Sequence, residues 1–346
     1  MTAIDKLCVL RLSAIGDCCH TLAVVRTLQQ HLPDTELTWV IGKTEAGLMA
    51  GLDGVELIVF DKAGGRRAIR DVQSALGGRE FDVLLNMHAS WRANRVSRLV
   101  RAQRRIGFDR DRARDLQWLF TDEHIAPQHQ PHVIDGLFGF AERIGVRGRT
   151  LDWRLPLDDE HREFAATLAD AGQPLVVISP CSSIRARNFR NWPASRYADV
   201  AQHLADRYGA RIAVTGGGSA LEMEYASEIV DSGPDGVVDL VGKTSLKGLA
   251  AIIERAALVL CPDSGPAHIA TAVGTPVVGL YATSNPGRTG PVSSQDTTVN
   301  AYPRALEQFM GKTIDEVRWG QRVRHPDAMG VITVDEVTAV IDGLLA

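Results

Sequence analysis

The 346-residue sequence predicts an α/β protein with two domains, each built on a parallel β-sheet that helices cover on both faces. Apolar segments of strand length alternate with amphipathic segments of helix length in both halves of the chain. Runs such as LVVIS and TPVVGLY are apolar throughout, which is typical of strands buried on both faces. Single domains rarely exceed about 250–300 residues, so this length favours two domains.

The alternation predicts the individual elements in order. Strands are expected over residues 7–11, 37–41, 57–60 and 81–86, and then over 175–179, 211–215, 237–240, 258–261 and 276–280. Helices are expected over residues 18–31, 133–144, 158–171, 195–208, 220–231, 246–256 and 333–345. Because the alternation weakens between residues 109 and 173, we expect a first domain of residues 1–165 and a second of residues 166–330. Residues 331–346 are expected to form a C-terminal helix that packs back on the first domain.

Charge is distributed unevenly along the chain. Residues 1–150 carry a net charge of +3, whereas the remainder carries −7. Nine arginines lie in residues 92–114, where Arg92, Arg95 and Arg98 recur at helical spacing and Arg101 and Arg105 continue it. A helix with one basic face suits an anionic partner, and a plain solvated helix is the alternative interpretation. Aromatic residues are not interleaved among these arginines, which argues against nucleic acid as the partner.

The remaining composition indicates a cytoplasmic protein. No apolar run approaches the roughly 20 residues that span a bilayer. Asp5 and Lys6 precede a short apolar run at the N-terminus, so we expect no signal peptide. The five cysteines are odd in number and lack metal-ligand spacing, which predicts reduced thiols that pack in the core. A reactive pair at Cys18 and Cys19 is the alternative.

Two loops that follow expected strands carry candidate chemistry, because ligands of parallel sheets bind beyond the carboxyl ends of the strands. In RLSAIGDCCHTL, residues 11–22, Asp17 is either a helix-capping residue or a general base. In SPCSSIRARNFRNWP, residues 179–193, Ser182 and Ser183 offer donors to phosphate oxygens. Arg187 or Arg190 offers a bidentate guanidinium to a diphosphate, unless this is merely a solvated basic loop.

Two further loops suit a nucleotide. TGGGSALEMEYA, residues 215–226, lacks the third glycine of a dinucleotide fingerprint because residue 221 is leucine, so a redox cofactor is weakly supported. Glu222 or Glu224 there either accepts hydrogen bonds from a ribose or complements the helix dipole. In DSGPAHIA, the amides around Ser264 and Gly265 at a helix start predict an anion site. Asp263 and His268 lie in the same turn.

DSGPAHIA followed by GTPVVGLY resembles the signature of glycosyltransferase family 9, the ADP-heptose:lipopolysaccharide heptosyltransferases. RLSAIGD…HTL is similar to the start of that family, and SPCSS…RNWP is similar to its mid-chain phosphate loop. The resemblance implies a GT-B fold, in which two Rossmann-like domains with parallel sheets face an interdomain cleft. It also implies an inverting transfer of heptose from ADP-heptose to the lipopolysaccharide inner core, with no cofactor and no metal.

The family resemblance also implies site residues. Asp17 would be the catalytic base. Nucleotide-sugar binding would fall to Ser182, Ser183, Arg187, Arg190, Glu222, Asp263, Ser264, Gly265 and His268. The choices between Arg187 and Arg190, and between Glu222 and Glu224, stay open. An anionic glycolipid acceptor is expected on the first domain, at Arg92, Arg95, Arg98 and His20.

Such an acceptor suggests contact with the inner face of the inner membrane. Arg190 stands where the family commonly has lysine, and the Cys18-Cys19 pair replaces an aliphatic pair. Asp109-Arg110-Asp111 spells the motif of metal-dependent transferases, but we interpret it as chance because it lies in a basic stretch. A nucleotide-sugar epimerase of the same fold, or an inactive nucleotide-sugar-binding protein, is the alternative function.

Overall fold

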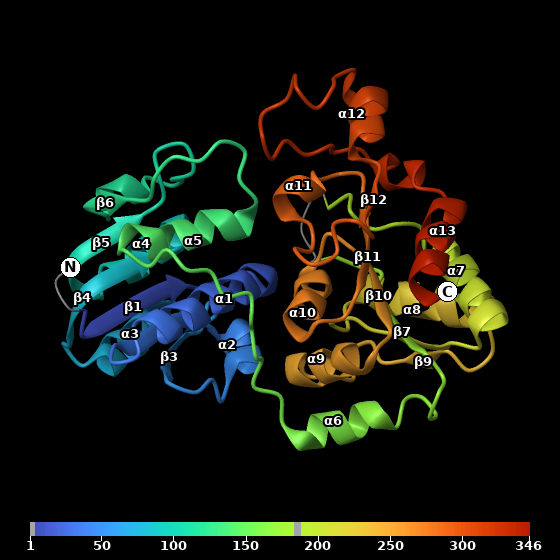
Figure 1. Cartoon of the computed structure of the whole chain (residues 1–346), viewed down its shortest axis with the longest axis horizontal. Helices are drawn as coiled ribbons and strands as arrows, with labels where there is room; N and C mark the ends of the chain where they lie inside the picture. The colour runs from blue at the N-terminus through green and yellow to red at the C-terminus, as the bar shows by residue number, and fades with distance from the viewer. Residues whose placement is uncertain (1–3, 183–187) are drawn as a thin grey trace. The chain divides into compact units, whose positions relative to one another are not determined.

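The computed structural model describes residues 4–182 and 188–346 (Figure 1). The chain divides into two compact units, unit 1 over Met1–Pro156 and unit 2 over Leu157–Ala346. Each unit contains one six-stranded sheet, and every strand pairing in both sheets is parallel. The predicted α/β class is therefore confirmed for both halves.

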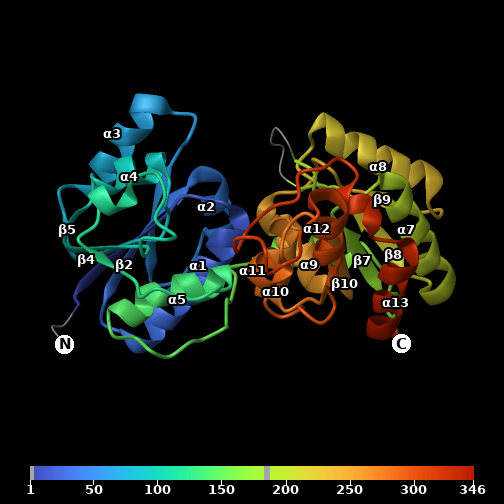
Figure 2. The same cartoon turned by 90° about the horizontal axis from the view of Figure 1, so that it is seen from above.

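Unit 1 has the strand order β3-β2-β1-β4-β5-β6. Its strands are β1 (Lys6–Arg11), β2 (Glu36–Gly42), β3 (Val55–Phe60), β4 (Glu80–Asn86), β5 (Arg101–Gly107) and β6 (Glu123–His124). Its helices are α1 (Ile15–His31), α2 (Lys43–Met49), α3 (Gly65–Leu76), α4 (Trp91–Ser97) and α5 (Val133–Arg143), with a short 3-10 helix η1 (Gln117–Leu119). Figure 2 shows α1 and α5 on one face of this sheet and α3 and α4 on the other.

Unit 2 has the strand order β12-β11-β10-β7-β8-β9. Its strands are β7 (Leu175–Ile178), β8 (Arg211–Val214), β9 (Val238–Asp239), β10 (Leu258–Pro262), β11 (Val277–Tyr281) and β12 (Val299–Asn300). Its helices are α6 (Asp159–Ala166), α7 (Ala194–Tyr208), α8 (Ala220–Ser232), α9 (Leu246–Arg255), α10 (Gly265–Val273), α11 (Pro286–Thr289), α12 (Tyr302–Met310) and α13 (Val334–Leu345), with a 3-10 helix η2 (Ala328–Val331). Helices α7, α8 and α13 lie on one face of the sheet, opposite α9 and α10 (Figure 1).

Burial explains why the apolar runs form central strands. Strands β1, β7, β10 and β11 are buried along nearly their whole length, so both faces of each must be apolar. The main core of unit 2 joins alternate residues of β7, β10 and β11 to α7, and it includes the fully buried Trp192 and Tyr197. Their rings meet edge to face with centroids 5.1 Å apart.

Both sheets follow the same Rossmann order, in which the first and fourth strands are neighbours at the point where the order reverses. In unit 1 this switch point lies between β1 and β4, and in unit 2 it lies between β7 and β10. Ligands of open α/β sheets bind outside the carboxyl ends of the strands at this point. The loops after these four strands are therefore the places where a site is expected.

All nine predicted strands are present, but one helix prediction is wrong. The basic helix that begins at Trp91 ends at Ser97, and Arg101 and Arg105 lie on strand β5. Backbone pairing of β5 with β4 overrides the high helix propensity of arginine. The side chain of Arg105 does not join a basic face, because its guanidinium donates to the carbonyls of Phe120, Val100 and Ser97 at 2.7–3.0 Å.

The C-terminal helix, which was expected to pack on the first domain, packs in unit 2. Val337 and Ile341 of α13 are buried in the core of unit 2, and His203 of α7 lies 2.7 Å from the Asp342 carboxylate. The division between the units at residues 156 and 157 also falls earlier than the expected boundary at residue 165. Helix α6 contacts α9, and Arg162 pairs with Glu254 at 2.8 Å, which ties α6 to unit 2.

Candidate functional site

The switch point of unit 1 holds Asp17, the predicted general base. Asp17 is the third residue of α1 and reaches back to the start of the helix, where its Oδ2 accepts from the Ala14 amide at 3.2 Å. The same oxygen lies 2.5 Å from Nη2 of Arg11. The Asp17 side chain is partly exposed, so its carboxylate is both held in place and accessible. The capping and functional interpretations of Asp17 are therefore compatible.

Arg11 fixes this carboxylate and was missed by the sequence reasoning. Its Nε donates to the Ser13 carbonyl at 2.9 Å, and its Nη1 donates to the carbonyl of Met87, the residue that follows β4. One buried guanidinium therefore joins the loop after β1, the loop after β4 and Asp17. A signal was present in the sequence, because an arginine ends an otherwise apolar strand and a buried charge requires partners.

His88 is a second residue at this switch point that the sequence did not single out. Its Nδ1 accepts from the Leu12 amide at 3.2 Å, so a neutral ring carries its proton on Nε2. Burial and the neighbouring Arg11 guanidinium lower the pKa of His88 to about 3. The ring is therefore a neutral hydrogen-bond donor beside the carboxylate of Asp17.

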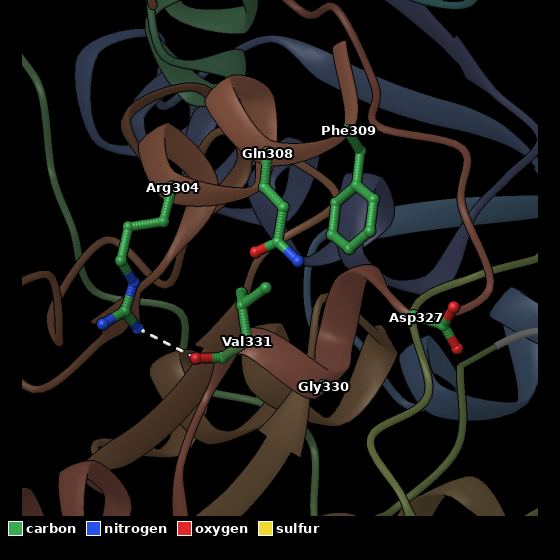
Figure 3. Close-up of a pocket in the computed structure, with 6 residues that line it drawn as sticks. All are labelled: Arg304, Gln308, Phe309, Asp327, Gly330 and Val331. Atoms are coloured by element: carbon green, nitrogen blue, oxygen red, sulfur yellow. Dashed lines mark hydrogen bonds between the residues drawn. The ribbon is translucent and has the colours of Figure 1, made fainter. Parts of the chain in front are cut away.

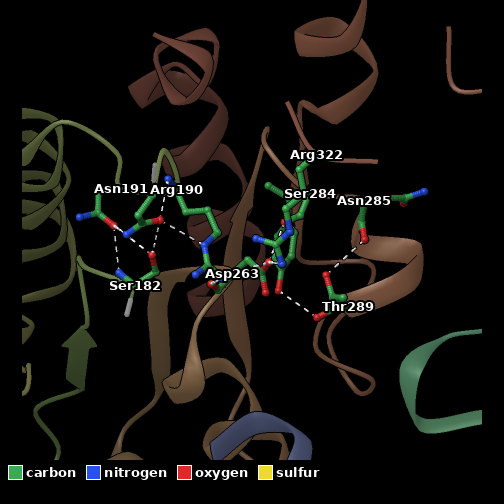
Figure 4. A network of polar contacts seen from close by, with 10 residues as sticks. Ser182, Arg190, Asn191, Asp263, Ser284, Asn285, Thr289 and Arg322 are labelled. Atoms are coloured by element: carbon green, nitrogen blue, oxygen red, sulfur yellow. Dashed lines mark hydrogen bonds and ion pairs between the residues drawn. The ribbon is translucent and has the colours of Figure 1, made fainter. Parts of the chain in front are cut away.

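The switch point of unit 2 holds a carboxylate between two arginines (Figure 4). Asp263 directly follows β10 and is buried, and its Oδ2 accepts from the Ser284 hydroxyl at 2.8 Å. The same oxygen lies 3.5 Å from Arg190 Nη1 and 3.6 Å from Arg322 Nη2. Two positive charges against one negative charge leave a net positive group, as an anion site requires. Arg322 and Ser284 were not predicted.

Among the described residues of the 179–193 loop, Arg190 reaches this group. Its Nη1 donates to the Asp263 carbonyl at 2.9 Å, and its Nε donates to Asn188 Oδ1 at 3.2 Å. Ser182 is buried, and its hydroxyl donates to the same Asn188 oxygen at 2.9 Å. Ser182 therefore orders the loop that carries Arg190. Ser183 and Arg187 lie outside the described residues.

Helix α10 begins beside Asp263. Ser264 is its N-cap residue, Gly265 is its first residue, and Pro266 suits the first turn. The first amides of a helix have no partner within the helix, and they coincide with the positive end of its dipole. His268 is buried in the next turn. Amide donors and two guanidiniums therefore converge at one sheet edge, which is the arrangement that a diphosphate requires.

The glycine turn after β8 is closed by Glu222. The two oxygens of its carboxylate accept from the amides of Gly217 and Ser219 at 2.8 and 2.9 Å, and Ser219 in turn caps α8. Burial acts to raise the pKa of Glu222, but these hydrogen bonds hold it below its usual range. Glu224 is exposed in the same turn. The dipole and capping interpretation accounts for Glu222, and the structure shows Glu224 without such a role.

The expected acceptor residues differ in exposure. Arg92 and Arg95 lie exposed on α4, and the exposed Arg98 follows its last residue. His20 is buried on α1, where its ring meets that of His132 edge to face at 5.6 Å. The role of His20 in acceptor binding stays a prediction.

The alternative sites from the sequence are accounted for as structural residues. Burial raises the pKa of the Cys19 thiol to about 12 and that of Cys18 well above its ordinary value, so both thiols stay protonated in the core. Asp109 is buried and bonds to Arg112 and to the Asp111 amide, as a turn residue does. Residues 4–182 and 188–346 contain no cluster of three side chains suited to a metal ion. The helices in these ranges include none long and apolar enough to cross a membrane.

A separate hollow of about 490 Å³ lies near the C-terminus of unit 2 (Figure 3). Its lining includes Arg304, Phe309 and Asp327. The guanidinium of Arg304 is already engaged, because it pairs with Glu336 at 2.7 Å and donates to the Val331 carbonyl at 3.2 Å. None of its lining residues belongs to the cationic group around Asp263, which is the stronger candidate.

Comparisons with known proteins agree with this geometry. Two parallel sheets in Rossmann order, one with two arginines and a helix start at its switch point, define an α/β protein of the kind that binds phosphorylated ligands. The sequence model of "Glycosyltransferase family 9 (heptosyltransferase)" matches residues 69–316. The chain is 39% identical to the lipopolysaccharide core heptosyltransferase OpsX of Haemophilus influenzae, over 96% of this chain and 94% of that protein. The chain belongs to glycosyltransferase family 9 and is a glycosyltransferase of the heptosyltransferase type.

Solved structures show the same fold. The glycosyl transferase family 9 protein of Veillonella parvula matches with a TM-score of 0.80 and 22% identity, over 99% of this chain and 97% of that one. Escherichia coli heptosyltransferase WaaC with ADP matches with a TM-score of 0.75 and 20% identity, over 98% of this chain and 99% of that one. The predicted family and GT-B type of fold are confirmed. The family match does not support an epimerase.

Proposed function

We propose that this enzyme transfers heptose from ADP-heptose to the inner core of lipopolysaccharide, with a Kdo- or heptose-bearing lipid A as the acceptor. The relatives support this choice, since OpsX is named a lipopolysaccharide core heptosyltransferase and the WaaC structure contains ADP. The observation that carries the proposal is the pair of arginines on Asp263 beside the first turn of α10.

Unit 2 stabilises the leaving group in this proposal. When the bond between the anomeric carbon and the diphosphate oxygen breaks, negative charge develops on ADP. Arg190 and Arg322 neutralise that charge without moving, because Asp263 already holds both guanidiniums. The amides at the start of α10 add donors, and two fixed cations supply the charge that a metal ion provides in other transferases. The reaction is therefore proposed to need no metal.

Unit 1 activates the acceptor. Asp17 takes the proton from an acceptor hydroxyl, and that oxygen forms a new bond to the anomeric carbon as ADP departs. A single displacement of this kind inverts the configuration at that carbon. Arg11 pairs with the Asp17 carboxylate and holds it in position. Arg92, Arg95 and Arg98 are proposed to bind the anionic part of the acceptor, which would place the enzyme on the cytoplasmic side of the inner membrane.

A nucleotide screen tests the donor half of the proposal. Thermal shift is measured with ADP, UDP and NAD, because a ligand at about 100 times its Kd stabilises the folded state by near 2.7 kcal/mol. A shift with ADP that exceeds those with UDP and NAD is expected. Equal shifts with ADP and UDP, or no shift with any nucleotide, would contradict the donor assignment.

The variant Asp17→Asn tests the catalytic half and separates an enzyme from an inactive binding protein. Asparagine keeps the size of the side chain and cannot accept the proton. We expect kcat to fall about 10²–10⁴-fold with the Kd for ADP unchanged. Asp34→Asn, an exposed substitution in the turn after α1, is the control. Near-normal turnover in Asp17→Asn would refute the assignment of the base.

A further inference from the structure

One face of unit 1 exposes large apolar side chains beside arginines. We call it the docking surface and define it by Trp91, Leu116, Trp118 and Leu119 together with Arg92, Arg95, Arg98 and Arg114. The four apolar side chains are 53%, 49%, 49% and 60% exposed, respectively. Single exposed apolar residues are ordinary, but four on two adjoining segments are typical of an interaction site.

The two segments of the docking surface lie side by side because the segment after β5 packs along α4. The Trp91 amide donates to Asp115 Oδ2 at 2.8 Å, and the Asn94 side chain donates to the Asp115 carbonyl at 2.8 Å. The rings of Trp91 and Phe120 meet edge to face with centroids 6.1 Å apart. The apolar residues of η1 therefore lie beside the exposed face of α4, whose position is labelled in Figure 2.

The protein holds the apolar side chains outward on a fixed support. Gln117, between them in sequence, is fully buried, and its side chain donates to the Asn86 carbonyl at 2.8 Å and accepts from the Phe108 amide at 3.1 Å. Leu116 has φ +58°, a left-handed conformation that leucine rarely adopts. The buried glutamine anchors the turn and leaves Leu116 and its neighbours facing solvent.

The arginines of the docking surface make no ion pair within residues 4–182 and 188–346. Other arginines of the same stretch are engaged: Arg104 pairs with Glu123 at 2.6 Å, and Arg112 pairs with Asp109. Asp115 lies beside the docking residues, and its carboxylate accepts from the Trp91 amide. The guanidiniums at this surface are thus available to external anions.

We infer that the docking surface binds the face of an anionic lipid bilayer. Tryptophan prefers the level of the lipid headgroups, leucine enters the acyl boundary, and arginine binds lipid phosphates. The combination of apolar and cationic groups on one face matches that layered chemistry. A sugar chain could stack on the tryptophan rings, but it offers no apolar layer to Leu116 and Leu119. This inference deepens the proposed function, on which it rests for a lipid-linked acceptor.

The test measures binding of the full chain to vesicles of phosphatidylcholine with phosphatidylglycerol and to vesicles of phosphatidylcholine alone, by co-sedimentation. The double variant Trp118→Ala/Leu119→Ser should weaken binding to anionic vesicles at least about tenfold, since each side chain loses contact with the acyl boundary. Arg95→Gln should weaken it about fivefold. Leu116→Gly removes an apolar side chain and places glycine, which adopts positive φ readily, at a left-handed position. We therefore expect weaker binding to anionic vesicles and an undiminished free energy of unfolding.

Matched controls lie elsewhere on unit 1. Leu151 is 52% exposed and Arg147 is exposed without an ion pair in the described ranges, so Leu151→Ser and Arg147→Gln should bind vesicles as the parent does. Brominated phosphatidylcholine should quench the tryptophan fluorescence of the parent, and most of this quenching should be absent in the double variant Trp91→Phe/Trp118→Phe. The inference is overturned if the control variants lose as much binding to anionic vesicles as the docking-surface variants do, or if the docking-surface variants lose none.

Activity assays distinguish failure of this inference from failure of the proposed function. With a deacylated, water-soluble core acceptor, Trp118→Ala/Leu119→Ser should keep parental turnover, and with an acylated acceptor in vesicles it should lose at least about tenfold. If the parent transfers heptose to neither acceptor, the proposed function is refuted. The bilayer inference is then decided by the vesicle-binding measurements. A dimer in ultracentrifugation that Leu119→Ser dissociates would show that a second copy occupies the surface and would overturn the bilayer assignment.

Discussion

The unequal burial of the two arginines on Asp263 predicts unequal losses when each is removed. The side chain of Arg190 is 14% exposed and that of Arg322 is 40% exposed. A hydrogen bond to a charged group contributes roughly 1.5–3 kcal/mol, and solvent screening moves an exposed contact toward the lower end of that range. Since each 1.4 kcal/mol is a factor of ten, Arg322→Ala should weaken ADP binding roughly 10-fold and Arg190→Ala roughly 100-fold.

Titration calorimetry with ADP and with adenosine checks this prediction. Adenosine lacks the diphosphate, so its affinity should be the same in the parent and in Arg322→Ala. Arg322→Lys keeps the charge but loses the planar fork that contacts two oxygens, so its affinity for ADP should lie between the parent and the alanine variant.

Arg255→Ala is the matched control for the loss of one positive charge. Arg255 is exposed at the end of α9, just before β10 begins, and so it lies at the sheet edge opposite the switch point. The affinity of the Arg255→Ala variant for ADP should equal that of the parent. The reasoning is refuted if Arg322→Ala binds ADP as tightly as Arg255→Ala does, or if adenosine and ADP lose affinity equally.

Three further predictions concern the switch-point loops. Arg11→Lys should lower kcat by up to about 10²-fold at an unchanged Kd for ADP, because Asp17 loses its orientation; an equal rise in the donor Kd would contradict this role. The pKa of His88 is about 3 in the folded state and near 6.5 when unfolded, so the unfolded chain gains a proton first as the pH falls. Stability should therefore decline from about pH 6.5 toward pH 3, and denaturant titrations of His88→Gln should show a shallower decline. Glu222→Ala should lower the free energy of unfolding by about 1 kcal/mol through loss of the capping box, and the exposed Glu224→Ala should leave it unchanged.

The sequence predicted the central strands well because burial on both faces demands an apolar run that few other structures use. Strands such as β7 and β10 are buried at every residue, and their positions were predicted almost to the residue. Strand β5 was missed because its pairing with β4 is non-local, while its arginines satisfy the local preference of a helix. The two-residue strands β6 and β12 carry too short a pattern to be recognised.

Candidate site residues were predictable where they lie in one motif and not where the fold assembles them. Asp17 and Asp263 each open a helix after an apolar strand, so a local pattern exposes them. Arg322 reaches Asp263 from a loop that lies 59 residues further along the chain and has no motif of its own. Ser284 joins the same group only because β11 pairs with β10. Such convergence follows from strand order, which local patterns do not contain.

The two switch points show how one topology supports two opposite kinds of chemistry. In each, an aspartate that follows a central strand meets an arginine that ends a central strand or lies in the loop after one, and the count of arginines sets the sign of the site. In unit 1 a single guanidinium, that of Arg11, pairs with Asp17, and its other nitrogens donate to backbone carbonyls. The positive charge is therefore not in excess, and the carboxylate of Asp17 stays partly exposed. In unit 2 two guanidiniums share the buried Asp263, so the surplus charge is positive. In the proposed function, Asp17 acts as the base for the acceptor hydroxyl and the group around Asp263 binds the diphosphate, so the same strand order would serve both roles.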